Sequence, residues 1–428
     1  MALHPTNPTL NFGESVWAIV NAKVGATPDV VNLGQGFPTW PAPGFVKQAA
    51  VDAIEGDLNQ YTSSRGHPRL LSAIAAEYGL PGGVELGPEN VAVSVGGCEA
   101  LCAAFFALIT PNEGQEILLL EPFFDCYDKQ IALAGGVAVY VPLTPPPPGS
   151  VDANEWALDM DALEAAVSPN TRGIVINTPH NPLGKVFSRT ELQGLADFAT
   201  AHNLVVISDE VYDRLAYDHD APHVSIAELD GMFDRTLRIG SAGKTFSVTG
   251  WKVGWASGPK DLVQALWLAR QWMTFTLAAP LQEAVAVAFE KAGPGGEEEG
   301  YYDAYREDLK GKRELMVSGL RAAGLNPIVP RGSYFCVCNI SHLEPLIPAP
   351  EEGEDDEGLD MRFTKWLISE IGVACIPCGW AFYSEAHRDL GSHFVRFCFA
   401  KSDDLIASAS SRLLKINDLL DQHTSEQQ

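Results

Sequence analysis

Short apolar runs alternate with amphipathic stretches through the first 260 residues of the chain. The apolar runs have the length of strands and lie at residues 91–95, 116–120, 137–141, 173–177, 204–208 and 235–240. The stretches between them have helical spacing and lie at residues 98–109, 126–134, 161–167 and 189–202. Strands that are apolar throughout, each followed by a helix, are typical of a parallel sheet covered on both faces. The pattern therefore predicts an α/β fold with a mostly parallel sheet.

The rest of the chain has a different pattern, with longer helices and fewer strands. Helices are expected at residues 14–24, 259–291, 301–323 and 361–371 and from 402 onwards, with strands near 30, 332–338, 373–377 and 393–399. A chain of 428 residues exceeds what one hydrophobic core usually serves. We therefore expect a large domain at 49–305, and a small domain that combines residues 1–48 with 306–428.

One segment of the predicted small domain, residues 348–360, carries seven acidic side chains. Its density of charge and its prolines oppose burial, so we expect a mobile insertion there.

The net charge of −26 argues against nucleic acid or an anionic membrane surface as the main partner. The N-terminus lacks a basic region followed by an apolar core, and no apolar run approaches the roughly 20 residues that span a bilayer. The eight cysteines are scattered through expected strands and helices, which favours core thiols over zinc ligands or disulfides. A cytoplasmic location is expected, and a mitochondrial one stays open.

Lys244 is the first candidate for chemistry, because it lies among glycines, hydroxyls and tryptophans with almost no acid nearby. Burial and a neighbouring cation favour a neutral, nucleophilic amine, which is what a Schiff-base lysine requires. Lys252 could be that cation, and with Ser241 it could hold a phosphate. Taken alone, a lysine in a glycine-rich loop is more often a surface residue.

Two further polar residues follow apolar runs as Lys244 does. Asp209 comes directly after the run 204–208, and Asn181 follows the run 173–177 after a short loop. Ligands of open parallel sheets collect beyond the carboxyl ends of the strands, so these three side chains are expected in one site. A lone aspartate in this position can also cap a helix.

Together these residues satisfy the needs of a pyridoxal 5′-phosphate (PLP) enzyme. Asp209 could keep the pyridine nitrogen protonated, with Tyr212 three residues further on. Asn181 could donate to the phenolate oxygen, and Phe124 could stack on the ring or belong to the core. Gly97 and Cys98 lie at the start of a helix, where their backbone N–H groups could hold the phosphate. Arg396 could bind a carboxylate through two parallel hydrogen bonds.

Several motifs occur in an order that resembles the class I/II PLP aminotransferases. They are Asn-Pro-Leu-Gly from 181, Ser-Asp-Glu-Val-Tyr from 208 and Ser-Ala-Gly-Lys-Thr-Phe-Ser-Val-Thr-Gly-Trp-Lys-Val-Gly-Trp from 241. Val-Asn-Leu-Gly-Gln-Gly-Phe-Pro from 31 and Glu-Pro-Phe-Phe-Asp-Cys-Tyr from 121 narrow the resemblance to the kynurenine aminotransferase/glutamine transaminase K branch. The similarity runs from about residue 12 to about residue 414.

This resemblance implies an aspartate-aminotransferase-like homodimer whose active sites lie at the subunit interface. Lys244 would carry the covalent link to PLP and move the substrate proton. Asp209 would hold the pyridine nitrogen, and Asn181 and Tyr212 the phenolate oxygen. The phosphate would be held by Ser241, Lys252, Gly97, Cys98 and, from the partner subunit, Tyr61. The substrate carboxylate would meet Gly36, Asn181 and Arg396, and Trp17 would line an aromatic pocket with Tyr61, Phe382 and Tyr383.

The implied reaction moves the amino group of kynurenine, a related aromatic or sulfur amino acid, or glutamine to a 2-oxo acid. A cysteine-S-conjugate β-lyase and a methionine- or aspartate-type aminotransferase are the alternatives. A silent binding module conflicts with the intact lysine, aspartate and arginine. Cys98, His180 and the segment 274–280 depart from the branch, which leaves the side-chain specificity open.

Overall fold

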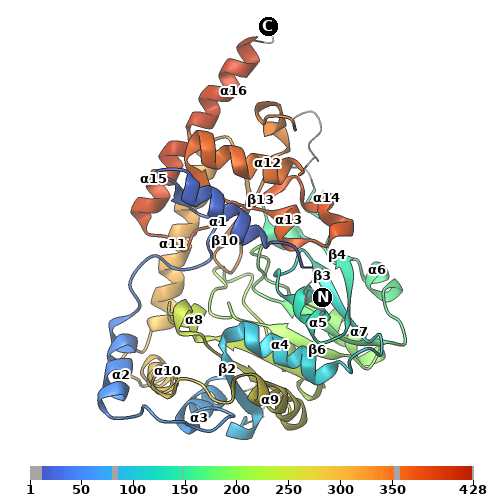
Figure 1. The fold of residues 1–428 in the computed structure, drawn as a ribbon, viewed down its shortest axis with the longest axis vertical. Helices are drawn as coiled ribbons and strands as arrows, with labels where there is room; N and C mark the ends of the chain where they lie inside the picture. The colour runs from blue at the N-terminus through green and yellow to red at the C-terminus, as the bar shows by residue number, and fades with distance from the viewer. Residues whose placement is uncertain (1–11, 80–84, 148, 351–356, 427–428) are drawn as a thin grey trace, which may run out of the picture.

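A seven-stranded sheet forms the centre of the larger part of the protein. The computed structural model describes residues 12–79, 85–147, 149–350 and 357–426. The strand order is β2-β8-β7-β6-β5-β3-β4 (Figure 1). The strands are β2 (Val91–Val95), β3 (Glu116–Glu121), β4 (Val137–Pro142), β5 (Thr171–Asn177), β6 (Val205–Asp209), β7 (Thr236–Ser241) and β8 (Val253–Ser257).

Strands β4, β3, β5, β6 and β7 are parallel, which confirms the predicted α/β sheet. Strand β8 was not predicted, and it runs antiparallel to both β7 and β2. Its first three residues belong to the motif that begins at Ser241 and contains Lys244, which the sequence pattern assigns to a loop. Because β8 itself contains Gly254 and Ser257 and follows a run of glycine, lysine and hydroxyl residues, its apolar pattern does not stand out from that loop.

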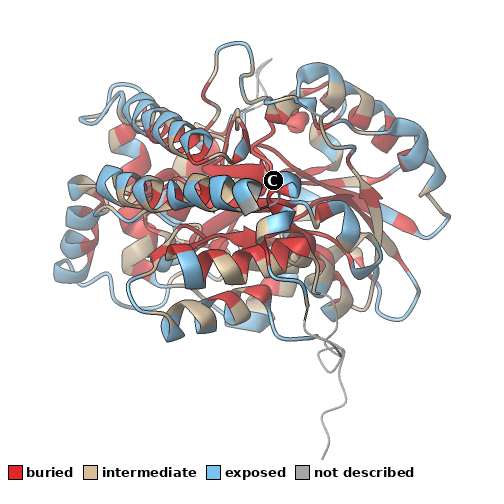
Figure 2. Ribbon diagram, turned by 90° about the horizontal axis from the view of Figure 1, so that it is seen from above, coloured by how far each residue is buried: buried red, intermediate tan, exposed pale blue. Residues whose placement is uncertain are grey.

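Helices cover both faces of this sheet, as Figure 2 shows by the buried strands between helices with exposed outer sides. Ile117 and Leu119 of β3 pack with α4, α5 and α9, whereas Leu118 and Leu120 pack with α6 and α7 on the opposite face. The helices of this part are α2 (Gly44–Glu55), α3 (Pro68–Glu77), α4 (Gly96–Leu108), α5 (Tyr127–Leu133), α6 (Met160–Ala165), α7 (Arg189–Ala201), α8 (Ala242–Thr245), α9 (Lys260–Thr274) and α10 (Ala279–Ala292).

Helix α7 illustrates how the local sequence fixes an element. The Ser188 hydroxyl accepts a hydrogen bond from Glu191 N at 3.2 Å, and the Glu191 carboxylate accepts one from Ser188 N at 2.8 Å. This capping box satisfies N–H groups that the first turn cannot pair. Leu192 and Leu195 then face the sheet, so cap and apolar spacing agree.

A second, four-stranded sheet has the order β12-β13-β10-β9, and the two-stranded pair β1–β11 lies beside it. These strands are β1 (Val31–Asn32), β9 (Asn326–Ile328), β10 (Phe335–Asn339), β11 (Val373–Ala374), β12 (Ile376–Pro377) and β13 (Phe394–Cys398). The helices around them are α1 (Val16–Ala26), α11 (Tyr301–Ala322), α12 (Leu359–Trp366), α13 (Cys378–Phe382), α14 (Arg388–Gly391), α15 (Asp403–Leu413) and α16 (Lys415–Glu426). The parallel pairing of β1 with β11 joins the N-terminal segment to the C-terminal third.

The predicted acidic insertion, residues 348–360, overlaps residues 351–356, which lie outside the described residues. Its last two residues, Leu359 and Asp360, are buried at the start of α12, so the predicted mobility is wrong for these two residues. The Asp360 carboxylate accepts a hydrogen bond from Gly379 N at 2.8 Å, and burial raises its pKa to about 7. Within the described ranges, no helix combines the length and the apolar character that crossing a bilayer requires.

We predict that Gly240→Ala destabilises the protein, because a Cβ at this position of β7 would lie 2.2 Å from Cε2 of the buried Trp255. The expected loss is about 2–3 kcal/mol in the free energy of unfolding, measured by denaturant titration. Gly194→Ala in α7 is the control, because no atom lies within 4 Å of its added Cβ. It should stabilise the protein by about 0.5–1 kcal/mol, and equal effects of the two changes would contradict the packing described for β7.

Candidate active site

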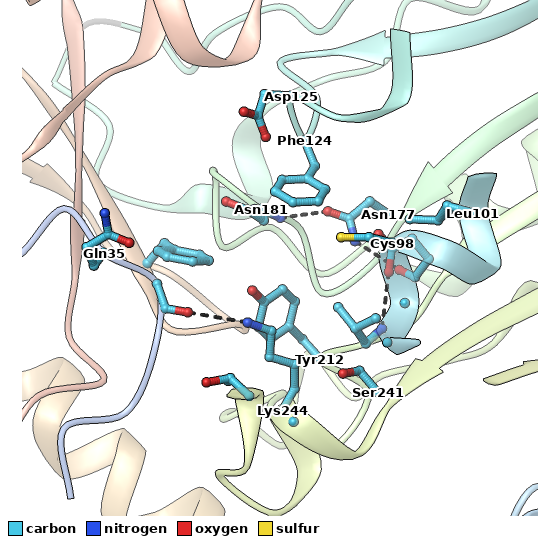
Figure 3. A pocket seen from close by; sticks show the side chains of 18 of the residues that line it. Gln35, Cys98, Leu101, Phe124, Asp125, Asn177, Asn181, Tyr212, Ser241 and Lys244 are labelled. Atoms are coloured by element: carbon cyan, nitrogen blue, oxygen red, sulfur yellow. Dashed lines mark hydrogen bonds between the residues drawn. The ribbon is translucent and has the colours of Figure 1, made fainter. Parts of the chain in front are cut away.

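A cavity of about 420 Å³ lies where strands β5, β6 and β7 end (Figure 3). The last residues of these strands, Asn177, Asp209 and Ser241, line it. Of the predicted site residues, Tyr61, Phe382 and Tyr383 do not line the cavity. Those that do are Trp17, Gly36, Gly97, Cys98, Phe124, Asn181, Asp209, Tyr212, Ser241, Lys244, Lys252 and Arg396. Asn181, Asp209 and Lys244 therefore lie at one cavity, as expected from their shared position after apolar strands.

Lys244 lies in α8, the single helical turn that follows β7, and its side chain points into the cavity. Its Nζ donates hydrogen bonds to Tyr334 Oη at 2.7 Å and to the Gly36 carbonyl oxygen at 3.3 Å. Burial lowers the pKa of Lys244 to about 8, and the positive charges of Lys252 and Arg396 act in the same direction. A substantial neutral fraction near physiological pH is the property that a nucleophilic amine needs.

Asp209 is buried at the end of β6 and accepts a hydrogen bond from Tyr127 Oη at 2.5 Å. Burial raises the pKa of Asp209 to about 6, while the Tyr127 hydrogen bond and the Lys244 charge oppose the rise. The carboxylate is therefore mostly ionised above neutral pH. It can pair with a protonated ring nitrogen that enters the cavity.

An anion cradle lies at the N-terminus of α4. The helix begins at Gly96, two residues earlier than predicted, and a Cβ built on Gly96 would lie 3.2 Å from Lys252 Nζ. A Cβ on Gly254 of β8 would lie 2.4 Å from the Gly96 carbonyl carbon, so only glycine permits this approach of the two backbones. Free N–H groups at a helix start, with the Lys252 ammonium and Ser241 beside them, are suited to a phosphate.

Arg396 of β13 is buried and lines the same cavity as this cradle. Its Nη1 donates to Asn181 Oδ1 and its Nη2 to the Gly34 carbonyl oxygen, both at 2.8 Å, while its buried Nε has no hydrogen-bond partner among the described residues. The guanidinium carbon lies 3.9 Å from the ring centroid of Phe335 and 5.0 Å from that of Trp17. A buried charge with an unpaired N–H favours an anionic ligand.

Trp17 and Tyr61 differ in position, although both were predicted near the substrate. Trp17 lines the cavity, and its Nε1 donates to Asp125 Oδ2 at 2.5 Å. Tyr61 lies outside the cavity of its own chain, with 84% of its surface exposed and its ring against Phe275. Phe382 is buried behind Trp17, at a centroid distance of 6.3 Å.

Sequence reasoning missed three residues that contact the predicted ones: Asp125, Tyr127 and Tyr334. Asp125 and Tyr127 occur in the Glu-Pro-Phe-Phe-Asp-Cys-Tyr motif, but neither was assigned a contact. The hydrogen bonds of Tyr127 and Tyr334 join residues 82 and 90 positions apart, so no local pattern marks them.

Residues 28–413 match the family model of aminotransferase class I and II. The chain belongs to this family. It is 42% identical to kynurenine–oxoglutarate transaminase 1 of Homo sapiens over 92% of this chain and 94% of the relative. A relative from Dictyostelium discoideum named kynurenine–oxoglutarate transaminase is 40% identical over 96% of both chains.

Solved structures of aminotransferases share the fold. The structure of Bna3p from Saccharomyces cerevisiae is 33% identical, covers 97% of this chain and 100% of its own, and has a TM-score of 0.90. N-succinyldiaminopimelate aminotransferase from Mycobacterium tuberculosis is 40% identical with a TM-score of 0.85, covering 96% and 100%. The protein is therefore a PLP-dependent transaminase with an aspartate-aminotransferase-like fold. The glycine cradle and the buried Asp209 fit that cofactor.

We predict that Tyr127→Phe weakens PLP binding by about threefold to tenfold near pH 5, because a lost hydrogen bond raises the pKa of Asp209 by about half to one unit. The acid limb of the binding profile should move to higher pH, as measured by titrating apoprotein with PLP between pH 5 and 8. Tyr302→Phe is the control, since its buried hydroxyl has no partner among the described residues. An unmoved acid limb in Tyr127→Phe would contradict the assigned role of this contact.

Proposed function

We propose that this transaminase moves the amino group of kynurenine, or of a related aromatic or sulfur amino acid, to a 2-oxo acid. The observation that supports the proposal most is the position of Arg396. Its guanidinium lies among the rings of Trp17, Phe335 and Phe382 at the cavity that holds Lys244. A guanidinium that can bind the substrate carboxylate, surrounded by aromatic rings, suits an amino acid with a flat, apolar side chain. The names of the relatives agree with this assignment.

Different residues of the cavity would bind different parts of the cofactor. Bound PLP supplies a protonated ring that withdraws electrons from the reacting carbon. Asp209, held by Tyr127, would keep the ring nitrogen protonated. Asn181 Oδ1 accepts a hydrogen bond from Arg396. Its Nδ2 is therefore available to donate a hydrogen bond to the ring oxygen, together with the Tyr212 hydroxyl.

The remaining contacts to the cofactor come from the cradle and from one aromatic ring. Lys252, Ser241 and the backbone N–H groups of Gly97 and Cys98 would hold the phosphate. Phe124 would cover one face of the ring, and Lys244 would approach from the other side. In Figure 3, Phe124 and Lys244 point into the cavity from opposite directions.

Lys244 would also carry the proton in the reaction. With its pKa lowered to about 8 mainly by burial, the amine is partly neutral at pH 7–8 and can remove a proton from the α-carbon of the substrate. The Arg396 guanidinium, with Gly36 and Asn181, would fix the α-carboxylate so that this proton faces the amine.

We further propose a homodimer in which Tyr61 reaches the cradle of the partner subunit. Tyr61, Trp272 and Phe275 are exposed by 84%, 86% and 61%, which is unusual for three large rings in neighbouring segments. Covering them with a second copy would remove this apolar surface from water.

We also retain the proposed division into a large domain, 49–305, and a small domain formed by 1–48 and 306–428.

The protein should convert kynurenine and 2-oxoglutarate into glutamate and the 2-oxo acid of kynurenine, which closes on its own aniline nitrogen. Lys244→Ala should lower the rate by at least about a thousandfold, because the nucleophile and the proton carrier are both lost. Arg396→Lys should raise KM about tenfold or more, since a single ammonium cannot replace the bidentate fork. Chromatography of the products gives the measurement.

An inactive wild-type protein would overturn the kynurenine assignment. Release of pyruvate from a cysteine S-conjugate, without transfer to an acceptor, would assign β-elimination as the main activity instead.

Co-expression of Lys244→Ala and Tyr61→Ala chains tests the shared site. Each variant alone should have low activity, but a mixed dimer holds one intact site. Random mixing should restore about a quarter of the wild-type activity. Activity equal to the mean of the two variants would contradict the contribution of Tyr61 across the interface.

A further inference from the structure

Among the described residues, the amine of Lys244 has two hydrogen-bond partners, and both come from the other sheet layer. Tyr334 directly precedes β10 of the four-stranded sheet, and Gly36 follows β1. Lys244 itself belongs to the end of β7 in the seven-stranded sheet. The amine is thus held across the boundary between the two layers.

Tyr334 cannot easily place its hydroxyl elsewhere. Its side chain is fully buried, and its ring packs against Tyr212 and Phe335 at centroid distances of 5.0 and 4.8 Å. The preceding residue, Ser333, has a left-handed backbone with φ of 58°, and its N–H donates to the Leu215 carbonyl oxygen at 2.9 Å. A non-glycine residue adopts this backbone rarely, so the surrounding contacts fix the direction in which the chain enters β10.

The direction of the hydrogen bonds follows from the available donors and acceptors. Tyr334 Oη donates its proton to the Gly36 carbonyl oxygen at 2.8 Å, and that carbonyl has no proton to return. With its proton on Gly36, the phenol oxygen accepts a hydrogen bond from Lys244 Nζ, which lies 2.7 Å away. Gly36 accepts from both, and a Cβ on Gly36 would lie 2.9 Å from Cζ of Phe335, so a larger residue would disturb this arrangement.

A neutral lysine amine has two N–H groups and one lone pair. When Tyr334 and Gly36 accept the two N–H groups, the lone pair takes the one remaining tetrahedral direction. Without the phenol oxygen, the only acceptor left from this pair is Gly36, at the longer distance of 3.3 Å, and the amine can rotate. The hydroxyl of Tyr334 therefore determines where the basic electron pair of Lys244 points.

We propose that Tyr334 is a positioning residue that holds the Lys244 amine, whenever it is not covalently engaged, with its lone pair fixed for proton transfer. The inference rests on the proposed function, because it concerns the same amine. It adds a role that the sequence motifs do not assign, and it links the strand that follows Tyr334 to the chemistry at Lys244.

The test uses Tyr334→Phe, which keeps the buried ring and removes only the hydroxyl. Tyr217→Phe is the matched control, because the buried Tyr217 hydroxyl also donates to a backbone carbonyl of the same loop, that of Ser333, but does not contact the cavity. Thermal unfolding of both variants checks that the fold is retained.

In the holoenzyme, Tyr334→Phe should lower kcat about tenfold or more and change KM less than about twofold, because the substrate anchors are untouched. The primary isotope effect with an amino donor deuterated at its α-carbon should increase, since proton transfer becomes slower relative to the other steps. Tyr217→Phe should leave kcat and the isotope effect at their wild-type values.

A second measurement needs no turnover. The rate at which apoprotein captures PLP depends on the neutral fraction of Lys244, and an accepting oxygen stabilises the ammonium form. In Tyr334→Phe the midpoint of this rate against pH should therefore move down by about half to one unit. The other titratable or charged groups that face this amine are Cys98, Asp209, Tyr212, Lys252, Arg396 and Cys398, and neither variant changes any of them.

The outcomes separate the two proposals. If Tyr334→Phe matches Tyr217→Phe in the isotope effect and in the capture profile, the positioning role is wrong whatever the substrate is. If the wild-type protein captures PLP but does not accept kynurenine, the substrate assignment fails, and both measurements can be made with another amino donor. Failure of the wild-type protein to capture PLP at all would overturn both.

Discussion

The concentration of positive charge in a buried cavity is the constraint on which the rest of the structure depends. Lys244, Lys252 and Arg396 all line a space of about 420 Å³ in a protein whose net charge is −26. Arg396 is buried and Lys244 is half-buried, whereas Lys252 is exposed at the rim. Holding charges of one sign together with little access to water is costly unless anions or hydrogen bonds compensate them. Part of the compensation is internal, through Asp209 and the carbonyl groups around Arg396 and Lys244. The remainder is what a phosphate and a carboxylate would supply, so the mutual repulsion of these cations favours the binding of anionic ligands.

The β7–β8 pair places two of these cations at defined positions. Lys244 lies one turn after β7, and Lys252, with its left-handed backbone, directly precedes β8. The antiparallel register pairs Ser241 with Gly254, which brings the connection back over the start of α4. The glycines that permit this approach serve packing and ligand binding together. A mutation that separates these strands would therefore move the amine and the phosphate cradle at once.

The parts of the site that could be predicted from the sequence follow local patterns. Asp209 and Lys244 were found because apolar strands precede them, and the start of α4 was found to within two residues because glycines precede an amphipathic stretch. The family resemblance then supplied roles for residues such as Arg396. Strand β8 was missed because its short pattern merges with the preceding loop. Tyr127 was missed because its contact with Asp209 depends on the packing of α5 against the sheet, which the sequence does not encode locally.

The contacts that lie between the two sheet layers are those that the sequence reveals least, yet they carry the substrate end of the site. Trp17 comes from α1, Tyr334 from the entry to β10 and Arg396 from β13, whereas Lys244 and Asp209 come from the seven-stranded sheet. Arg396 reaches across the boundary to Asn181, and Tyr334 reaches across it to Lys244. Any movement of one layer against the other must change both contacts together. The group that would hold the substrate carboxylate and the group that aims the base are thus mechanically linked, so that correct seating of one favours correct geometry at the other.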